Sequence, residues 1–338
     1  MLHTLSVEDV VKQCLTFDDV LLVPRYVQNV KSRLDPRLNT SIGSVKLDVP
    51  IISANMSTIT ELNMMVAMAD AGCLGILHRF LPIEQQRDVV VKARSKGLQD
   101  VAVSIGVSPG YLADTELLIK AGANVVCVDV AHGDSAKVIE VVKTIRKEFP
   151  STTVIAGNIA TPSAALRLAS AGAKVLKIGI GPGSLCITRS VAGCGVPQLA
   201  AIAAISLTLK NAGGFDDVTL IADGGIRTTG DIIKALAVGA DAVMIGRLFA
   251  GTDEAPLSGK YFGMASKEAG RIKENIAPEG TVTSVAPQGS VSDVVASIKA
   301  GLQTAMSYQD ALTLEDLRQD PQFVRVTMAG LAESGVRL

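Results

Sequence analysis

The chain has 338 residues, of which 48% are hydrophobic and only 3% aromatic, and its formal net charge at pH 7 is −1. This balance excludes the strongly basic field that favours nucleic-acid binding, and the longest apolar runs fall far short of the roughly 18 residues of a membrane span. A core built mainly from Ala, Val, Ile and Leu is typical of buried parallel strands that are covered by helices.

The cysteines and the N-terminal residues indicate the cellular compartment of the protein. The five cysteines are an odd number and show no Cys-x-x-Cys spacing, so we expect a reduced, cytoplasmic chain with no disulfide framework and no zinc site. The first residues are acidic and lack a signal-peptide pattern. We therefore expect neither nucleic acid nor membrane among the partners.

Short β-branched runs alternate with longer helical patterns along most of the chain. Strands are predicted at residues 49–55, 73–79, 101–107, 125–131, 152–158, 175–181, 218–224 and 242–248. Helices are predicted at residues 83–96, 111–121, 134–148, 162–171, 196–211 and 230–238. Residues 15–22 precede this pattern, and we expect them to pack against it.

Eight strand–helix units of roughly 25–30 residues predict a TIM (β/α)8 barrel, forming a single domain over residues 1–338. A doubly wound sheet is the structural alternative, but its glycine-rich turn follows the first strand, whereas here such a turn follows the sixth. Residues 251–287, after the eighth strand, are predicted to form a mobile flap, with a solvated excursion as the alternative. A helix is expected at residues 291–306 and a short strand within 322–327.

The most informative motif is the glycine-rich loop at residues 179–189, which ends the sixth predicted strand. Three glycines in five residues precede Ser184 and Cys186. Glycine lets the backbone approach a ligand closely, and rows of bare N–H or carbonyl groups bind ions. Cys186 is therefore a candidate nucleophile, although a buried structural cysteine in a tight turn is the alternative.

The ends of the other predicted strands should converge with this loop on one mouth of the barrel. Glycines after the seventh and eighth strands, Gly224, Gly225 and Gly246, match the usual phosphate site of such barrels. Asp223 could hold ribose hydroxyls or simply cap a turn. Arg247 could pair bidentately with a phosphate or face solvent.

Several of these motifs resemble the IMP dehydrogenase / GMP reductase family. The resemblance covers nearly the whole chain and rests on residues 15–22, 179–188, 193–198, 221–226 and 261–264. It implies a purine nucleotide substrate, a nicotinamide cofactor and a homotetramer of barrels. It also implies that Cys186 attacks C2 of the purine to give a covalent intermediate.

Together with the barrel argument, the resemblance assigns roles to individual residues. Catalysis is expected from Cys186, Thr188 and Glu279, and a potassium ion from the carbonyls of Gly181, Gly183 and Cys186. The substrate-binding residues would be Ser184, Asp223, Gly224, Gly225, Gly246, Arg247, Tyr261, Gly263, Met264 and Gly280. The cofactor-binding residues would be Asp129, Val130, Ala131, Asn158, Gly179 and Gly181.

Within the family, the sequence favours a GMP reductase, which uses NADPH to convert GMP to IMP and ammonia. The flap is short, and Arg271 is followed by Ile272, whereas dehydrogenases carry an Arg-Tyr pair there to activate water. No pair of CBS modules interrupts residues 81–101, where many dehydrogenases hold one. Thr188 and Glu279 match the reductase proton-transfer pair, although dehydrogenases also have the Thr and often the Glu.

The alternative is an IMP dehydrogenase without CBS domains, which oxidises IMP to XMP with NAD. Two other classes stay open: a flavin-dependent barrel oxidoreductase, and a nucleotide-binding relative that has lost catalysis. Two positions depart from the family pattern. Ser57 stands where the family usually has Asp, and Arg247 replaces a small Gly or Ser beside the phosphate.

Overall fold

The computed structural model describes residues 3–270, 275 and 277–334. Eight parallel strands close into a barrel, in which each strand pairs with its neighbours in chain order and the last pairs with the first. They are β5 (Ile51–Ser53), β6 (Leu74–Leu77), β7 (Ala102–Ile105), β8 (Val125–Asp129), β9 (Thr153–Ile159), β10 (Val175–Ile178), β11 (Thr219–Asp223) and β12 (Ala242–Ile245). The predicted TIM barrel is confirmed.

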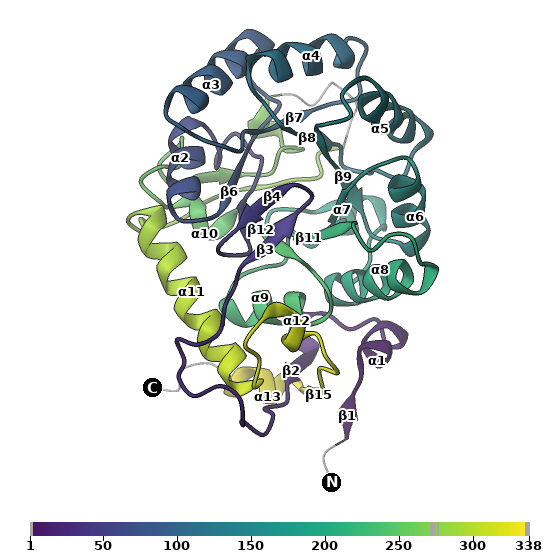
Figure 1. Ribbon diagram of the computed structural model, residues 1–338, viewed down its shortest axis with the longest axis vertical. Helices are drawn as coiled ribbons and strands as arrows, with labels where there is room; N and C mark the ends of the chain where they lie inside the picture. The colour runs from purple at the N-terminus through teal and green to yellow at the C-terminus, as the bar shows by residue number, and fades with distance from the viewer. Residues whose placement is uncertain (1–2, 271–274, 276, 335–338) are drawn as a thin grey trace.

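Helices surround the barrel and cover its apolar outer face (Figure 1). They are α2 (Leu62–Asp70), α3 (Ile83–Ser95), α4 (Tyr111–Ala121), α5 (Ala136–Glu148), α6 (Pro162–Ser170), α8 (Gln198–Ala212), α9 (Thr229–Ala237) and α11 (Val291–Tyr308). Hydroxyls cap several of them: Ser135, Thr161 and Thr228 each accept a backbone N–H in the first turn of α5, α6 and α9. Between β6 and β7 the chain forms α3 alone, with no inserted domain.

Segments from both ends of the chain form a small sheet beside the barrel, near the two termini in Figure 1. Its order is β1 (Thr4–Leu5), β15 (Phe323–Arg325) and β2 (Val20–Leu22). Around it lie α1 (Val7–Lys12), the 3-10 helix η1 (Phe17–Asp19), α12 (Leu314–Leu317) and α13 (Met328–Glu333). The expected short strand near residue 322 is confirmed, as is the packing of residues 15–22, because Ala200 donates its N–H to the Leu15 carbonyl at 3.0 Å.

A hairpin closes the end of the barrel at which the strands begin. It consists of β3 (Thr40–Ile42) and β4 (Val45–Leu47), which Figure 1 shows across the strands. At its tip the Gly43 N–H donates to Thr219 Oγ1 at 3.1 Å, and the Ser44 and Thr153 hydroxyls lie 2.7 Å apart. Thr153 and Thr219 are the first residues of β9 and β11, so the opposite end of the barrel is the open mouth.

Seven of the eight strands end earlier than the sequence predicts, and β9 ends one residue later. The sixth strand stops at Ile178 because Gly179 and Gly181 adopt φ of +151° and +83°, which are incompatible with an extended strand. The eighth stops at Ile245, since Arg247 already begins the short helix α10 (Arg247–Ala250).

The predicted flap contains regular structure where we expected only a loop. β13 (Lys260–Phe262) pairs antiparallel with β14 (Val282–Ser284), and the 3-10 helix η2 (Lys267–Ala269) lies between them. Arg271 and Ile272, on which the branch argument rested, lie outside the described residues. Within the described part of the chain, no helix is both long and apolar enough to cross a bilayer.

Candidate active site

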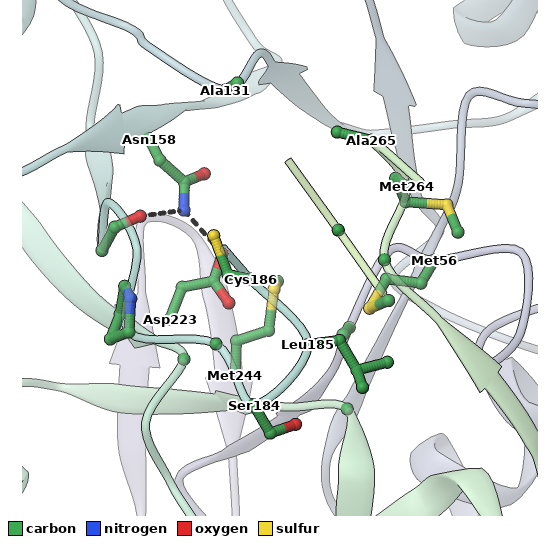
Figure 2. Close-up of a pocket in the computed structure, with 18 of the residues that line it drawn as sticks. Met56, Ala131, Asn158, Ser184, Leu185, Cys186, Asp223, Met244, Met264 and Ala265 are labelled. Carbon is green, nitrogen blue, oxygen red and sulfur yellow. Dashed lines mark hydrogen bonds between the residues drawn. The ribbon is translucent and has the colours of Figure 1, made fainter. Parts of the chain in front are cut away.

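A cavity of about 360 Å³ opens at the mouth of the barrel, a size that suits a small-molecule site. Every predicted site residue lines it, from strand ends, the glycine-rich loop and the flap. Figure 2 shows Cys186, Asp223 and Asn158 grouped together, with Met56, Met264 and Ala265 across the cavity. The structure therefore brings all these residues to one site, while their individual roles stay predictions.

The glycine-rich loop has its shape because side chains would not fit within it. A Cβ atom on Gly179 would lie 1.9 Å from the Asp223 carbonyl oxygen, and one on Gly181 would lie 2.6 Å from Arg189 Cγ. Cys186 donates its N–H to the Gly183 carbonyl at 3.0 Å, and the short helix α7 (Thr188–Ala192) follows. These contacts present the Cys186 side chain to the cavity.

Backbone hydrogen bonds join the base of the flap to this loop. Ile187 donates its N–H to the Glu279 carbonyl at 2.9 Å, and Thr281 donates to the Leu185 carbonyl at 3.0 Å. The two segments run antiparallel, with Cys186 opposite Gly280. This pairing holds the Glu279 side chain beside the cysteine, although 93 positions separate the two residues in sequence.

Cys186, Thr188 and Glu279 form a continuous hydrogen-bonded chain. The Thr188 hydroxyl donates to Glu279 Oε2 at 2.6 Å, and Cys186 Sγ lies 3.0 Å from Thr188 Oγ1. Because the hydroxyl hydrogen points to the carboxylate, the Thr188 oxygen is left to accept a proton from the thiol. The arrangement can therefore pass a proton between the sulfur and the carboxylate.

Two other cysteines of this chain, Cys73 and Cys127, match the alternative of a buried structural cysteine. Cys73 and Cys127 lie in the core, and burial raises the pKa of each thiol to about 12. Cys14 and Cys194 are exposed and do not line the cavity. Cys186 is half-buried at the cavity wall, so, unlike the two core thiols, it is accessible to a ligand in the cavity.

A buried lysine that the sequence analysis missed links four neighbouring strands. Lys177, 3% exposed on β10, lies 2.7 Å from an oxygen of Asp223 on β11 and 3.3 Å from an oxygen of Asp129 on β8. It also donates to Asn158 Oδ1 on β9, and Asn158 Nδ2 donates to Asp223 at 2.9 Å and to the Gly179 carbonyl at 2.8 Å. The sequence signal that could have revealed this residue is a single lysine within the otherwise apolar run 175–178.

Electrostatics keep this cluster charged. Burial alone would lower the pKa of Lys177, but the Asp223 and Asp129 carboxylates raise it above its ordinary value. Burial likewise opposes ionisation of Asp129, yet Lys177 and Arg79 bring its pKa below the ordinary value. Arg79, also missed from sequence, lies 3.5 Å from Asp129 and stacks over Phe80 at 4.7 Å. The cavity thus keeps an ionised carboxylate on the side of the predicted cofactor residues.

Next to this cluster, directly after Asp223 and after β12, the loops that follow the seventh and eighth strands form a cradle of glycines. Gly224 and Gly225 have φ of +91° and +80°, and a Cβ atom on Gly246 would lie 2.6 Å from the Tyr261 hydroxyl. Burial raises the pKa of Tyr261, so its phenol stays protonated and can donate a hydrogen bond. Arg247, exposed at the rim, has no ion-pair partner among the described residues. Such a cradle suits an anion.

Metal binding was predicted through backbone carbonyls. The described residues contain no group of three or more His, Cys, Asp or Glu side chains that could hold a metal ion. The Gly183 carbonyl accepts the Cys186 N–H, which leaves it one lone pair for a cation.

Ser57, which departs from the family pattern, donates to Met264 Sδ at 3.7 Å beside the cavity.

Comparison with known proteins places the chain among purine-nucleotide enzymes. A model of the IMP dehydrogenase / GMP reductase domain matches residues 14–337. The inosine-5′-monophosphate dehydrogenase of Borreliella burgdorferi is 34% identical over 96% of this chain and 97% of its own length. The enzymes of the same name from Cryptosporidium parvum and Aquifex aeolicus are 35% and 32% identical, over 95% and 98% of this chain and 94% and 96% of their own lengths.

These relatives overturn the predicted GMP reductase, since all of them are named dehydrogenases. The missing insert was a poor guide because α3 completes the barrel between β6 and β7 without one. The alignment with the Aquifex aeolicus enzyme spans 479 positions, so that enzyme carries a long stretch with no counterpart in these 338 residues and still matches 98% of this chain. The Thr188–Glu279 pair does not separate the two branches. The chain belongs to the IMP dehydrogenase / GMP reductase family, whose members are oxidoreductases that act on purine nucleotides.

Proposed function

We propose that this protein is an IMP dehydrogenase, which converts IMP, NAD and water to XMP, NADH and a proton. The observation that carries the chemistry is the hydrogen-bonded chain Cys186–Thr188–Glu279 at the wall of the cavity. The names of the curated relatives favour the dehydrogenase over the reductase.

The proposed reaction begins with the addition of the Cys186 thiolate to C2 of the purine. This bond makes C2 tetrahedral, and hydride can then depart from it as the ring regains its C2–N double bond. NAD supplies the acceptor for that hydride. Water then adds to C2 of the covalent intermediate, the C2–S bond breaks, and XMP and the thiolate are released. Atoms and charge balance with the release of one proton.

The Thr188–Glu279 pair supports proton transfer from the thiol in the first half of the reaction and from water in the second half. Glu279 can receive the thiol proton through Thr188, because the threonine hydroxyl donates to the carboxylate and accepts from the sulfur. Once that proton has passed to solvent, the same carboxylate can receive a proton from the attacking water in the second half of the reaction. No other described carboxylate shares a hydrogen-bonded connection with Cys186.

Beside Asp129, we expect the cavity to accept NAD better than its 2′-phosphorylated relative. Asp129 stays ionised because Lys177 and Arg79 lower its pKa, although burial opposes this. An ionised carboxylate accepts hydrogen bonds from a ribose diol and repels a phosphate in the same place. Asp129, Val130, Ala131 and Asn158 would hold the cofactor beside the purine.

The nucleotide would lie with its phosphate on the glycine cradle. Gly224, Gly225 and Gly246 offer backbone N–H groups, Tyr261 offers a hydroxyl, and Asp223 is placed for the ribose diol. We include Arg247 because its guanidinium lacks an ion-pair partner among residues 3–270 and 277–334. If Arg247→Ala left the KM and Kd for IMP unchanged, this role would be wrong.

A potassium ion and a homotetramer are further parts of the proposal, supported by the family resemblance. The carbonyls of Gly181, Gly183 and Cys186 would hold the ion. Turnover should then depend on potassium when sodium is the reference salt. Light scattering of the purified protein would measure the assembly directly.

The experiment is a pair of assays on the purified protein in potassium buffer, followed by the absorbance of the reduced nicotinamide. IMP with NAD should give a rise in absorbance and equimolar XMP, and GMP with NADPH should give no change. Consumption of NADPH with release of ammonia would overturn the proposal. Trapping of an IMP-derived mass on the peptide that contains Cys186 would identify the covalent step.

A further inference from the structure

The segment that precedes the barrel lies directly behind the seventh-strand loop. Phe17, 3% exposed, packs beneath Gly225, where an added Cβ atom would lie 3.5 Å from its ring atom Cε2. Gly224 in turn abuts the cysteine loop, since a Cβ there would lie 3.0 Å from Pro182 and 3.1 Å from the Gly183 nitrogen. The N-terminal segment, the glycine cradle and the cysteine loop therefore form one packed stack.

Arg227 joins this segment to the cradle. It follows Gly224, Gly225 and Ile226 in sequence and lines the cavity. Its guanidinium forms a two-pronged pair with Asp18 of η1, in which the Nη1–Oδ2 distance is 3.0 Å. On its other side the Arg227 backbone N–H and Nε donate to Asp231 of α9 at 3.0 and 3.3 Å.

A second cation, Lys234, holds the same N-terminal segment against α9. Lys234 of α9 is 8% exposed, and its ammonium donates to the Phe17 carbonyl at 2.7 Å and to the Val20 carbonyl at 3.4 Å. The burial of Lys234 and its hydrogen bonds to two backbone carbonyls indicate that residues 17–20 are held in one position against α9. Asp18 therefore offers Arg227 a rigid anchor, although both side chains are partly exposed.

We propose that Asp18 is a positioning residue, which fixes the Gly224–Gly225 loop for the 5′-phosphate of the nucleotide through Arg227. This inference rests on the proposed function, because it takes the glycine cradle as the phosphate site. Two adjacent glycines have wide conformational freedom, so a preorganised cradle needs an external anchor. Asp231 alone ties Arg227 only to the helix that follows the loop, whereas Asp18 ties it to a different part of the chain.

The test compares Asp18→Asn with wild type, using calorimetric titration of IMP and of inosine and the KM for NAD. We expect the Kd for IMP to rise about threefold to tenfold, as for the loss of a partly exposed two-pronged ion pair. The affinity for inosine, which lacks the phosphate, and the KM for NAD should change by less than about twofold. Asp18→Glu keeps the charge and should recover most of the IMP affinity.

Asp217→Asn is the matched control, because Asp217 also pairs with a cation, Lys174, at the closed end of the barrel. It should leave the Kd for IMP unchanged. Equal weakening of IMP and inosine by Asp18→Asn, an unchanged Kd for IMP, or tighter IMP binding by a released Arg227 would each overturn the inference. Absence of NAD-dependent turnover in wild type that still binds IMP would instead refute the proposed function.

Discussion

The two ends of the barrel use polar residues in different ways. At the closed end, side chains bind nearby backbone: Asn124 accepts the Val101 N–H at 2.8 Å, and Asp241 accepts the Leu220 N–H at 2.7 Å. At the mouth, polar side chains from four strands bind one another around Lys177 and border an open cavity. The first arrangement satisfies groups that folding would otherwise leave unpaired, and the second holds charged groups ready for a ligand.

The comparison teaches where stability and activity should separate. Changes at the closed end should cost folding free energy and leave catalysis intact. Changes at the mouth should cost catalysis first, except where a buried charge loses its partner.

Removal of the nucleophile should give the largest effect. We expect Cys186→Ala to lower kcat by on the order of 10⁴-fold or more, because no other described cysteine lines the cavity. IMP should still bind, since the phosphate cradle is intact. Steady-state kinetics and titration calorimetry measure the two quantities, and substantial residual turnover would contradict the covalent mechanism.

Loss of the buried cation should damage both activity and folding. Lys177→Met leaves the carboxylates of Asp129 and Asp223 without their shared partner, which should cost about 3–5 kcal/mol of unfolding free energy. We expect kcat/KM to fall at least about 100-fold. Lys177→Arg keeps the charge and is the control. Denaturant melts and kinetics that showed Lys177→Met to be as stable as wild type would refute the proposed electrostatic role.

Removal of the carboxylate charge should have an intermediate effect. Glu279→Gln keeps the shape of the side chain but cannot take up a proton, so kcat should fall about 10² to 10⁴-fold with little change in the KM for IMP. Glu268→Gln, an exposed residue of the same flap, should behave as wild type. If both variants were equally active, Glu279 would not be the proton acceptor.

The smallest effect on activity is expected at the closed end. A Cβ atom on Gly239, whose φ is +115°, would lie 2.1 Å from Ser206 Oγ, so Gly239→Ala should cost about 1–3 kcal/mol of stability. Gly97→Ala shares a positive φ of +89° but meets nothing within 4 Å, so it measures the backbone strain alone. Both variants should keep the wild-type kcat/KM. A large loss of activity in Gly239→Ala would show that the two ends are coupled.

Sequence patterns predicted the barrel well because short β-branched runs and longer helical patterns report local structure. They predicted strand ends poorly: the sixth and eighth strands run three residues too far in the prediction, since the positive φ of the glycines and the start of α10 override apolar composition. The flap hairpin was missed because β13 and β14 are three residues each and pair across about twenty positions.

The choice of branch shows another limit. Absence of an insert and the presence of Thr188 and Glu279 are compatible with both members of the family, so these two features did not discriminate, and Arg271 and Ile272 lie outside the described residues. The relatives did, through similarity spread over the whole chain rather than through one motif.

Sequence patterns were enough to predict the fold class and most of the residues at the mouth, because strand–helix alternation closes a barrel and the carboxyl ends of parallel strands converge. Which of these residues contact one another became visible only in the folded chain. Thr188 meets Glu279 across 91 positions, Arg227 meets Asp18 across 209, and Lys177 reaches carboxylates on two other strands. The physical reason is that such pairings depend on where strands, loops and the flap lie in space and on side-chain direction, and no local sequence pattern records either.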